Sequence, residues 1–127
     1  MVHDHVKLII RLDLGGAGRV GPGKLQLLAR IDELGSISAA ARTMRMSYRQ
    51  AWDLVQQMNE AFAEPVVASQ TGGKHGGGAT LTEFGRALLA HLAAINKEAE
   101  QAASRHLAAV ERSLRSSRRK REAQGKG

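Results

Sequence analysis

The sequence contains no cysteine and few aromatic residues. Without cysteine it can form neither a disulfide framework nor a thiolate metal site. Aromatics make up only 3% of the residues, so a core must be built from aliphatic side chains, methionine and alanine, which suits packed helices better than a large β-sandwich. No apolar run approaches the ~20 residues that a membrane-spanning helix needs. The run Leu8–Ile10 is too short for a signal peptide, so we expect a cytoplasmic protein with no membrane partner.

Positive charge is concentrated at the C-terminus. Residues 112–127 hold seven Lys or Arg and one Glu, which is +6 of the formal net charge of +7, and residues 1–111 are nearly neutral. The polar run 116–127 predicts a disordered basic tail. Its cluster Arg118–Arg121 could neutralise DNA phosphates without sequence preference, or simply keep the end of the chain solvated. Because residues 1–111 are nearly neutral, they must recognise a charged partner through individually placed side chains and not through their net charge.

The stretch Ser36–Asn59 predicts two helices joined by a tight turn. Ser36 and Ser47 are each suited to cap a helix, because a serine hydroxyl can accept from the unpaired N–H groups of the first turn. The small residues Ala39–Ala41 give the first helix a flat face that a second helix can cross closely. The second helix has apolar residues three or four apart, and we expect its tryptophan to lie in the core. These residues are Tyr48, Ala51, Trp52, Val55, Met58 and Phe62.

Regular elements are also predicted on both sides of this helix-turn-helix. Alternation over Val6–Leu14 predicts a half-buried strand, residues 15–23 form a loop, and a helix follows over Lys24–Leu34 with Gly35 as its stop. On the other side, strands over Val66–Gln70 and Ala79–Leu81 predict a hairpin around a glycine-rich loop. Because a two-stranded ribbon alone is marginal, the N-terminal strand could join it as a third.

The last predicted element is a long helix that begins after Thr82, a suitable capping residue. Its apolar stripe has a heptad-like spacing, and a rod of this length must bury part of the stripe against another chain, most economically the same helix of a second copy. We therefore predict a homodimer. The expected interface residues are Leu88, Leu92, Ile95, Ala99, Ala102, His106 and Val110. Gly85 in the first turn costs helix propensity and predicts a close approach of another backbone, for which the helix-turn-helix is the candidate.

The predicted fold is mainly α with a small β-wing. Residues 1–81 form a winged helix-turn-helix DNA-binding domain, 82–115 a long C-terminal dimerisation helix, and 116–127 the basic tail.

The polar outer face of the second helix could enter a DNA major groove. Arginine can pair with guanine through two hydrogen bonds and glutamine can pair likewise with adenine, so Arg49 and Gln50 are the expected base contacts. Hydroxyl groups and the helix N-terminus can hold phosphates, and the wing tip can reach a flanking groove or phosphate. The predicted DNA-binding residues are Ser36, Ser38, Ser47, Tyr48, Arg49, Gln50, Lys74 and His75.

Catalytic and metal-binding patterns are not apparent. No Ser/His/Asp or paired-carboxylate arrangement stands out, and the loop before Lys74 does not fit a P-loop, which requires Ser or Thr after the lysine. His3 and His5 are a weak metal pair at a frayed terminus. We expect no enzyme activity, no metal and no cofactor.

Three motifs together resemble the N-terminal domain of the ModE-type, molybdate-responsive transcriptional regulators. They are Ser36-Ile-Ser-Ala-Ala-Ala, the segment Ser47-Tyr-Arg-Gln-Ala-Trp-Asp with Met58-Asn59, and Thr71-Gly-Gly-Lys-His-Gly-Gly-Gly-Ala79 with Leu81-Thr82. That domain is similar to the winged helix of LysR-type regulators. The resemblance covers roughly residues 6–115. It implies a dimer that binds a two-fold site on double-stranded DNA and acts on molybdate transport genes, often as a repressor.

This sequence differs from the ModE family in one respect. Molybdate ligands of the ModE family lie in C-terminal β-barrel domains, whereas this sequence ends in the basic tail. No residue here is therefore expected to inherit that role, and the effector is unknown. Two other functions stay open. The chain could be a protein-interaction module that pairs with a separate sensor or regulator, or the glycine-rich loop could sense an oxyanion directly.

Overall fold

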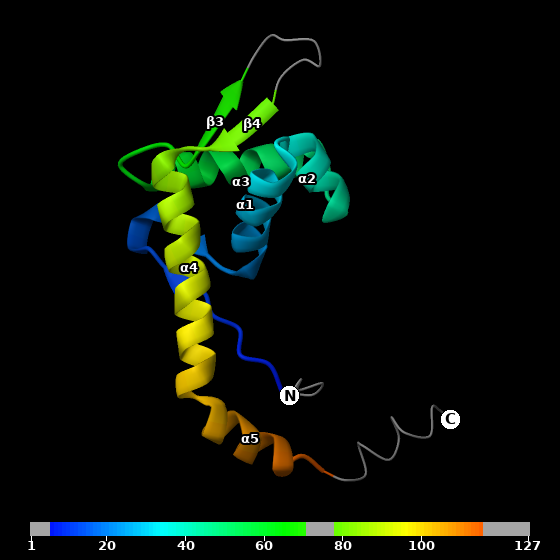
Figure 1. Ribbon diagram of the computed structural model, residues 1–127, viewed down its shortest axis with the longest axis vertical. Coiled ribbons are helices and arrows are strands. Elements are labelled where there is room, and N and C mark those ends of the chain that lie inside the picture. The colour runs from blue at the N-terminus through cyan, green and yellow to red at the C-terminus, as the bar shows by residue number, and fades with distance from the viewer. Residues whose placement is uncertain (1–5, 71–77, 116–127) are drawn as a thin grey trace, which may run out of the picture. The chain divides into compact units, whose positions relative to one another are not determined.

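The computed structural model describes residues 6–70 and 78–115 and divides the chain into two compact units. Of the described residues, the larger unit holds 9–70 and 78–96, and the other holds 6–8 and 97–115. The larger unit has a helix-turn-helix and a hairpin, so the predicted mainly α fold with a small β-wing is confirmed (Figure 1). The elements in chain order are β1 (Leu12–Asp13), η1 (Gly15–Ala17), β2 (Arg19–Val20), α1 (Pro22–Leu34), α2 (Ile37–Thr43), α3 (Tyr48–Ala61), β3 (Val67–Gln70), β4 (Gly78–Leu81), α4 (Glu83–Ala102) and α5 (Ser104–Arg112).

Helix α1 is fixed at both ends by local chemistry. Pro22 occupies its first turn, two residues before the predicted start, because proline lacks an N–H group that would go unpaired there. Gly35 ends the helix as predicted: it adopts φ 73° and donates its N–H to the carbonyl of Ile31. Leu27, Leu28 and Ile31 are fully buried, which anchors α1 in the core.

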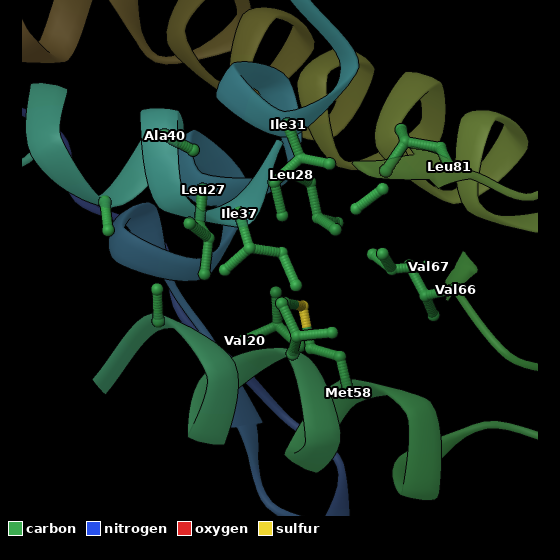
Figure 2. Close-up of a cluster of buried hydrophobic side chains, with 14 of the residues drawn as sticks. Val20, Leu27, Leu28, Ile31, Ile37, Ala40, Met58, Val66, Val67 and Leu81 are labelled. Carbon is green, nitrogen blue, oxygen red and sulfur yellow. The ribbon is translucent and has the colours of Figure 1, made fainter. Parts of the chain in front are cut away.

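The core lies where α1, α2, α3 and the hairpin meet, and Figure 2 shows their side chains converging there. Ala40, Ala41 and Ala51 are buried, so the predicted flat alanine face does let α2 and α3 pack closely. Among the described residues, the buried hydrophobic side chains are Val20, Leu27, Leu28, Ile31, Ile37, Ala40, Ala41, Ala51, Val55, Met58, Val66, Val67, Ala79, Leu81 and Leu92.

The strands form two separate antiparallel pairs. Strand β3 pairs with β4, as predicted for the wing, whereas β1 pairs with β2. The idea that the N-terminal strand joins the hairpin is therefore wrong. The predicted strand over Val6–Leu14 is also too long, because only Leu12–Asp13 pairs with another strand. That partner, β2, has only two residues and is followed closely by α1. Its alternation does persist in the exposure of the side chains, with Ile10, Leu12 and Leu14 half-buried and the residues between them exposed.

The segment before β3 is joined to both α3 and α4. The Asn59 side chain accepts from the N–H groups of Val66 at 2.7 Å and Val67 at 3.0 Å, and its amide donates to the Val67 carbonyl at 3.3 Å. Thr82 donates its hydroxyl to the Pro65 carbonyl at 2.7 Å and its N–H to the Val66 carbonyl at 3.0 Å. The hairpin base is therefore held to the end of one helix and the start of another.

The start of α4 confirms two predictions. The Thr82 hydroxyl accepts from the Gly85 N–H at 2.8 Å, so Thr82 caps the helix. A Cβ placed on Gly85 would lie only 2.1 Å from the Val66 carbonyl oxygen, so glycine does permit a close backbone approach. The backbone approached is Val66 at the hairpin base and not the helix-turn-helix, so the expected neighbour is corrected.

The prediction of one continuous helix over 82–115 is wrong. Helix α4 ends at Ala102, and α5 begins at Ser104. At Ala103 the backbone adopts φ −94° and ψ 3°, which lies outside the helical region and interrupts the hydrogen-bond ladder. The sequence gives no sign of this break, because residues 86–114 include neither proline nor glycine.

Candidate nucleic-acid interface

Both helices of the helix-turn-helix begin at the predicted serine caps. The Ser36 hydroxyl accepts from the Ala39 N–H at 3.0 Å, and the Ser47 hydroxyl accepts from the Gln50 N–H at 3.0 Å. The side-chain oxygen Oε1 of Gln50 in turn accepts from the Ser47 N–H at 3.0 Å, which completes a capping box. Each serine still has a hydroxyl hydrogen that can be donated to a phosphate.

The capping box changes what Gln50 can offer to a base. Pairing with adenine requires both the carbonyl oxygen and the amide of glutamine. In this structure the oxygen is engaged at the start of α3, so the amide N–H groups are its remaining donors. Gln50 is exposed, but it contributes to the local fold as well as to the surface.

The outer face of α3 carries two aromatic side chains, one of which was misplaced by the sequence prediction. Trp52 is 38% exposed and Tyr48 is 54% exposed, so the expectation that Trp52 lies in the core is wrong. The inner face is filled by Ala51, Val55 and Met58, and the half-buried Leu54 packs against this core. Trp52 is therefore part of the surface that α3 presents.

Arg49 lies on the same face and is paired there. Its side chain is 81% exposed, and its Nε lies 3.4 Å from Oδ1 of Asp53, whose side chain is 51% exposed. Its guanidinium carbon lies 5.9 Å from the centre of the Trp52 ring, within reach of a cation–π interaction. The one arginine of α3 thus has an acidic and an aromatic neighbour.

The charges around the start of α3 are unfavourable for the helix itself. A helix N-terminus carries partial positive charge and is stabilised by acidic residues, yet the first turn of α3 has none and contains Arg49. The turn before it contains Arg45, whose φ of 56° is the only positive value among the non-glycine residues that the structure describes. Local electrostatics and backbone strain that oppose folding are typical of a surface kept for binding.

Two cations of this surface were missed by the sequence prediction. Arg42 and Arg45 are exposed at the end of α2 and in the turn before α3, and Arg42 lies 3.5 Å from the hydroxyl of Ser38. The signal that could have identified them is their position: any cation within the turn of a helix-turn-helix lies near the N-terminus of the second helix. They add positive charge beside the predicted phosphate contacts Ser38 and Ser47.

The structure places six of the eight predicted DNA contacts. Ser38, Ser47, Tyr48, Arg49 and Gln50 are exposed, and Ser36 is half-buried at its cap. The other two, Lys74 and His75, lie outside the described residues, as do His3 and His5. The hairpin that carries the loop between β3 and β4 extends beside the end of α3 (Figure 1).

Other kinds of site receive no support from the residues that can be described. Within 6–70 and 78–115, no group of three or more His, Asp or Glu side chains comes together to hold a metal ion. No helix in these ranges is both long enough and apolar enough to cross a membrane.

Comparison with known families decides what kind of helix-turn-helix this is. Residues 22–86, from the start of α1 to the first turn of α4, match the bacterial regulatory helix-turn-helix proteins of the lysR family. The chain belongs to this family. Its helix-turn-helix, formed by α2 and α3, is therefore that of a bacterial regulatory protein.

The chain is also similar to individual proteins, some of which are named for molybdenum-pterin binding or molybdenum transport. The chain is 48% identical over 96 residues to the molybdenum-pterin-binding protein MopB of Rhodobacter capsulatus, covering 76% of this chain and 34% of MopB. It is 35% identical over 99 residues to the molybdenum transport protein ModE of Azotobacter vinelandii, covering 78% of this chain and 36% of that protein. It is also 43% identical over 68 residues to the DNA-binding transcriptional dual regulator ModE of Escherichia coli, covering 54% of this chain and 26% of the regulator. The chain thus spans about a third of the length of these relatives or less.

Proposed function

We propose that this protein is a sequence-specific transcription regulator that inserts α3 into the major groove of double-stranded DNA. The observation that carries the proposal is the outer face of α3. It presents the 81% exposed Arg49 beside a capped helix N-terminus, within a fold whose family regulates transcription. Arg49 is the base contact, and Gln50 contributes its amide. The phosphate contacts are Ser36, Ser38, Ser47 and Tyr48. In the wing, a flanking groove or phosphate is bound by Lys74 and His75.

We further propose that the regulated genes serve molybdenum metabolism. The support is the set of relatives described above, whose names refer to molybdenum-pterin binding and molybdenum transport. Because the chain spans only about a third of these relatives, their ligand-binding activity is not carried over to it. The proposal is limited to the genes that the DNA-binding domain selects.

The regulator is proposed to act as a homodimer on a two-fold DNA site. Two apolar residues of the predicted interface are exposed, Ile95 to 38% in α4 and Val110 to 53% in α5. Ala102 and His106 are exposed as well, and Ala99 and Leu88 are partly so. Leu92 is 5% exposed and belongs to the chain's own core, so it contributes to the fold instead of to a partner.

Selection of bound fragments from a random duplex DNA pool tests DNA binding, symmetry and half-site spacing together. We expect an inverted repeat, as a two-fold dimer requires. Arg49→Ala is expected to lose about 1–3 kcal/mol of discrimination at one base pair of each half-site. Arg11→Ala removes the same charge outside the helix-turn-helix and is the matched control.

A wing variant separates base recognition from phosphate binding. Lys74→Ala is expected to weaken binding to all sequences similarly and to reduce the slope of affinity against salt by about one. If Arg49→Ala and Lys74→Ala lower specific and non-specific binding in the same ratio, the proposed roles are wrong. If no sequence is enriched and the protein is a monomer without salt-dependent DNA binding, a protein-interaction module replaces the proposal.

A further inference from the structure

Arg49 is surrounded by side chains that restrict it. An exposed arginine has many rotamers, and ordering it against a base costs conformational entropy. Here Asp53, one helical turn further along α3, lies 3.4 Å from Nε, and the Trp52 ring lies 5.9 Å from the guanidinium carbon. Residues three and four positions apart lie on one face of a helix, so both neighbours can act on Arg49 without any change in the backbone.

The atom that Asp53 approaches is the important detail. Guanine presents two acceptors in the major groove, O6 and N7, which match two parallel N–H donors. The carboxylate of Asp53 lies beside Nε, so the two terminal Nη groups are available as that pair. The indole ring provides a surface that can fix the plane of the guanidinium group.

We propose that Asp53 and Trp52 are positioning residues that hold Arg49 for two-donor pairing with guanine. The inference rests on the proposed DNA-binding function and adds a specificity mechanism to it. An exposed ion pair of this kind stabilises the free protein little. The pair becomes stronger when the groove excludes water from it, so its effect is felt in the specific complex.

Asp53 should also weaken binding to the wrong DNA. A carboxylate on the face that meets DNA repels the phosphates of every sequence, and only a correct guanine contact by Arg49 compensates for this repulsion. Removing the charge of Asp53 is therefore expected to have two opposite effects. Affinity for non-specific DNA rises, whereas discrimination for guanine falls.

The test compares Asp53→Asn with Glu60→Gln in the full chain. Glu60 is also exposed and lies seven residues further along α3, on the same face, so its variant loses the same charge away from Arg49. Fluorescence anisotropy measures binding to the selected DNA site and to the same site with one G·C pair replaced by A·T. The pair to be replaced is the one at which the Arg49→Ala variant no longer distinguishes G·C from A·T.

For wild-type protein we expect discrimination of about 10- to 100-fold at that pair. Asp53→Asn is expected to reduce it about three- to tenfold and to bind unrelated DNA about twofold more tightly. Glu60→Gln is expected to leave discrimination unchanged. Asp53→Glu should restore most of it, and Trp52→Leu should reduce it about twofold by removing the ring. On the Arg49→Ala background, Asp53→Asn should cause no further loss of discrimination.

Three results would overturn the positioning role: unchanged discrimination in Asp53→Asn, an equal loss in Glu60→Gln, or an additive loss on the Arg49→Ala background. These results differ from failure of the proposed function, in which the wild-type protein itself enriches no sequence and both proposals are lost. Because Asp53 is half-exposed and outside the core, urea denaturation of Asp53→Asn is expected to match the wild type.

Discussion

Replacing Gly85 by alanine is the most direct test of how α4 is joined to the hairpin. The new Cβ would lie 2.1 Å from the carbonyl oxygen of Val66 and 3.0 Å from its carbonyl carbon. Even short C–H···O contacts keep carbon and oxygen about 3.3 Å apart, so the two backbones must separate by about 1 Å. Neither neighbour is a flexible side chain that could turn away.

The separation would also strain the hydrogen bonds of this junction. The Thr82 N–H donates to the Val66 carbonyl at 3.0 Å, and the Gly85 N–H donates to the Thr82 hydroxyl at 2.8 Å. Loss of two such bonds costs about 2 kcal/mol, and overpacking adds about 1–3 kcal/mol. Alanine regains about 1 kcal/mol of helix propensity over glycine. We expect Gly85→Ala to lower the free energy of unfolding by about 2–4 kcal/mol.

Urea denaturation followed by far-UV circular dichroism measures this change. Ala90→Gly is the control, because residue 90 is exposed on the same helix and should show the propensity effect alone, a loss of about 1 kcal/mol. Alanine is thus expected to be the better residue at position 90 and the worse one at position 85. A gain of stability in Gly85→Ala would refute the reasoning, since helix propensity would then outweigh the contact with Val66.

Three further substitutions test the helix-turn-helix. Ser47→Ala should cost about 1 kcal/mol of unfolding free energy by removing the cap of α3, whereas Ser38→Ala, which leaves both caps intact, should cost less than half of that in the same urea titration. Asn59→Ala should cost about 2–3 kcal/mol because it leaves backbone groups of Val66 and Val67 unpaired; a loss no larger than that of Asn96→Ala, which removes one hydrogen bond to the Leu92 carbonyl, would contradict this. Arg45→Gly should raise stability by up to about 1 kcal/mol by relieving the left-handed backbone, and should weaken binding to DNA of any sequence; thermal unfolding and fluorescence anisotropy check the two effects, and a lower melting temperature would count against the strain.

Local chemistry made much of the helix-turn-helix predictable. The caps Ser36, Ser47 and Thr82 and the stop at Gly35 depend on groups within a few residues of each helix end, so the sequence contains the whole interaction. Gly85 was predictable for a related reason, since glycine in a helix is costly unless a neighbour requires it. The identity of that neighbour depended on tertiary structure and could not be deduced.

One of the errors could have been avoided from the sequence, and two could not. Trp52 was assigned to the core by its spacing, yet at about 100° per residue it lies about 120° from Met58, whereas Leu54 lies only about 40° from it. A helical wheel centred on Met58 would have placed the indole at the boundary. The shortened N-terminal strand and the break at Ala103 gave no such signal. Strand length depends on a partner that β2 provides for only two residues, and no helix-breaking residue lies near Ala103.

Side-chain hydrogen bonds hold helix α3 in place at both of its ends and not along its outer face. The capping box of Ser47 and Gln50 holds its first turn, and the Asn59 amide holds its last turn to backbone groups of the hairpin base. On the outer face, Arg49 and Asp53 contribute to the surface and little to the fold. These positions can therefore be randomised to recode the preferred DNA sequence on an unchanged scaffold. A library limited to them is expected to give mostly folded proteins, whereas one that includes Ser47 or Asn59 is not.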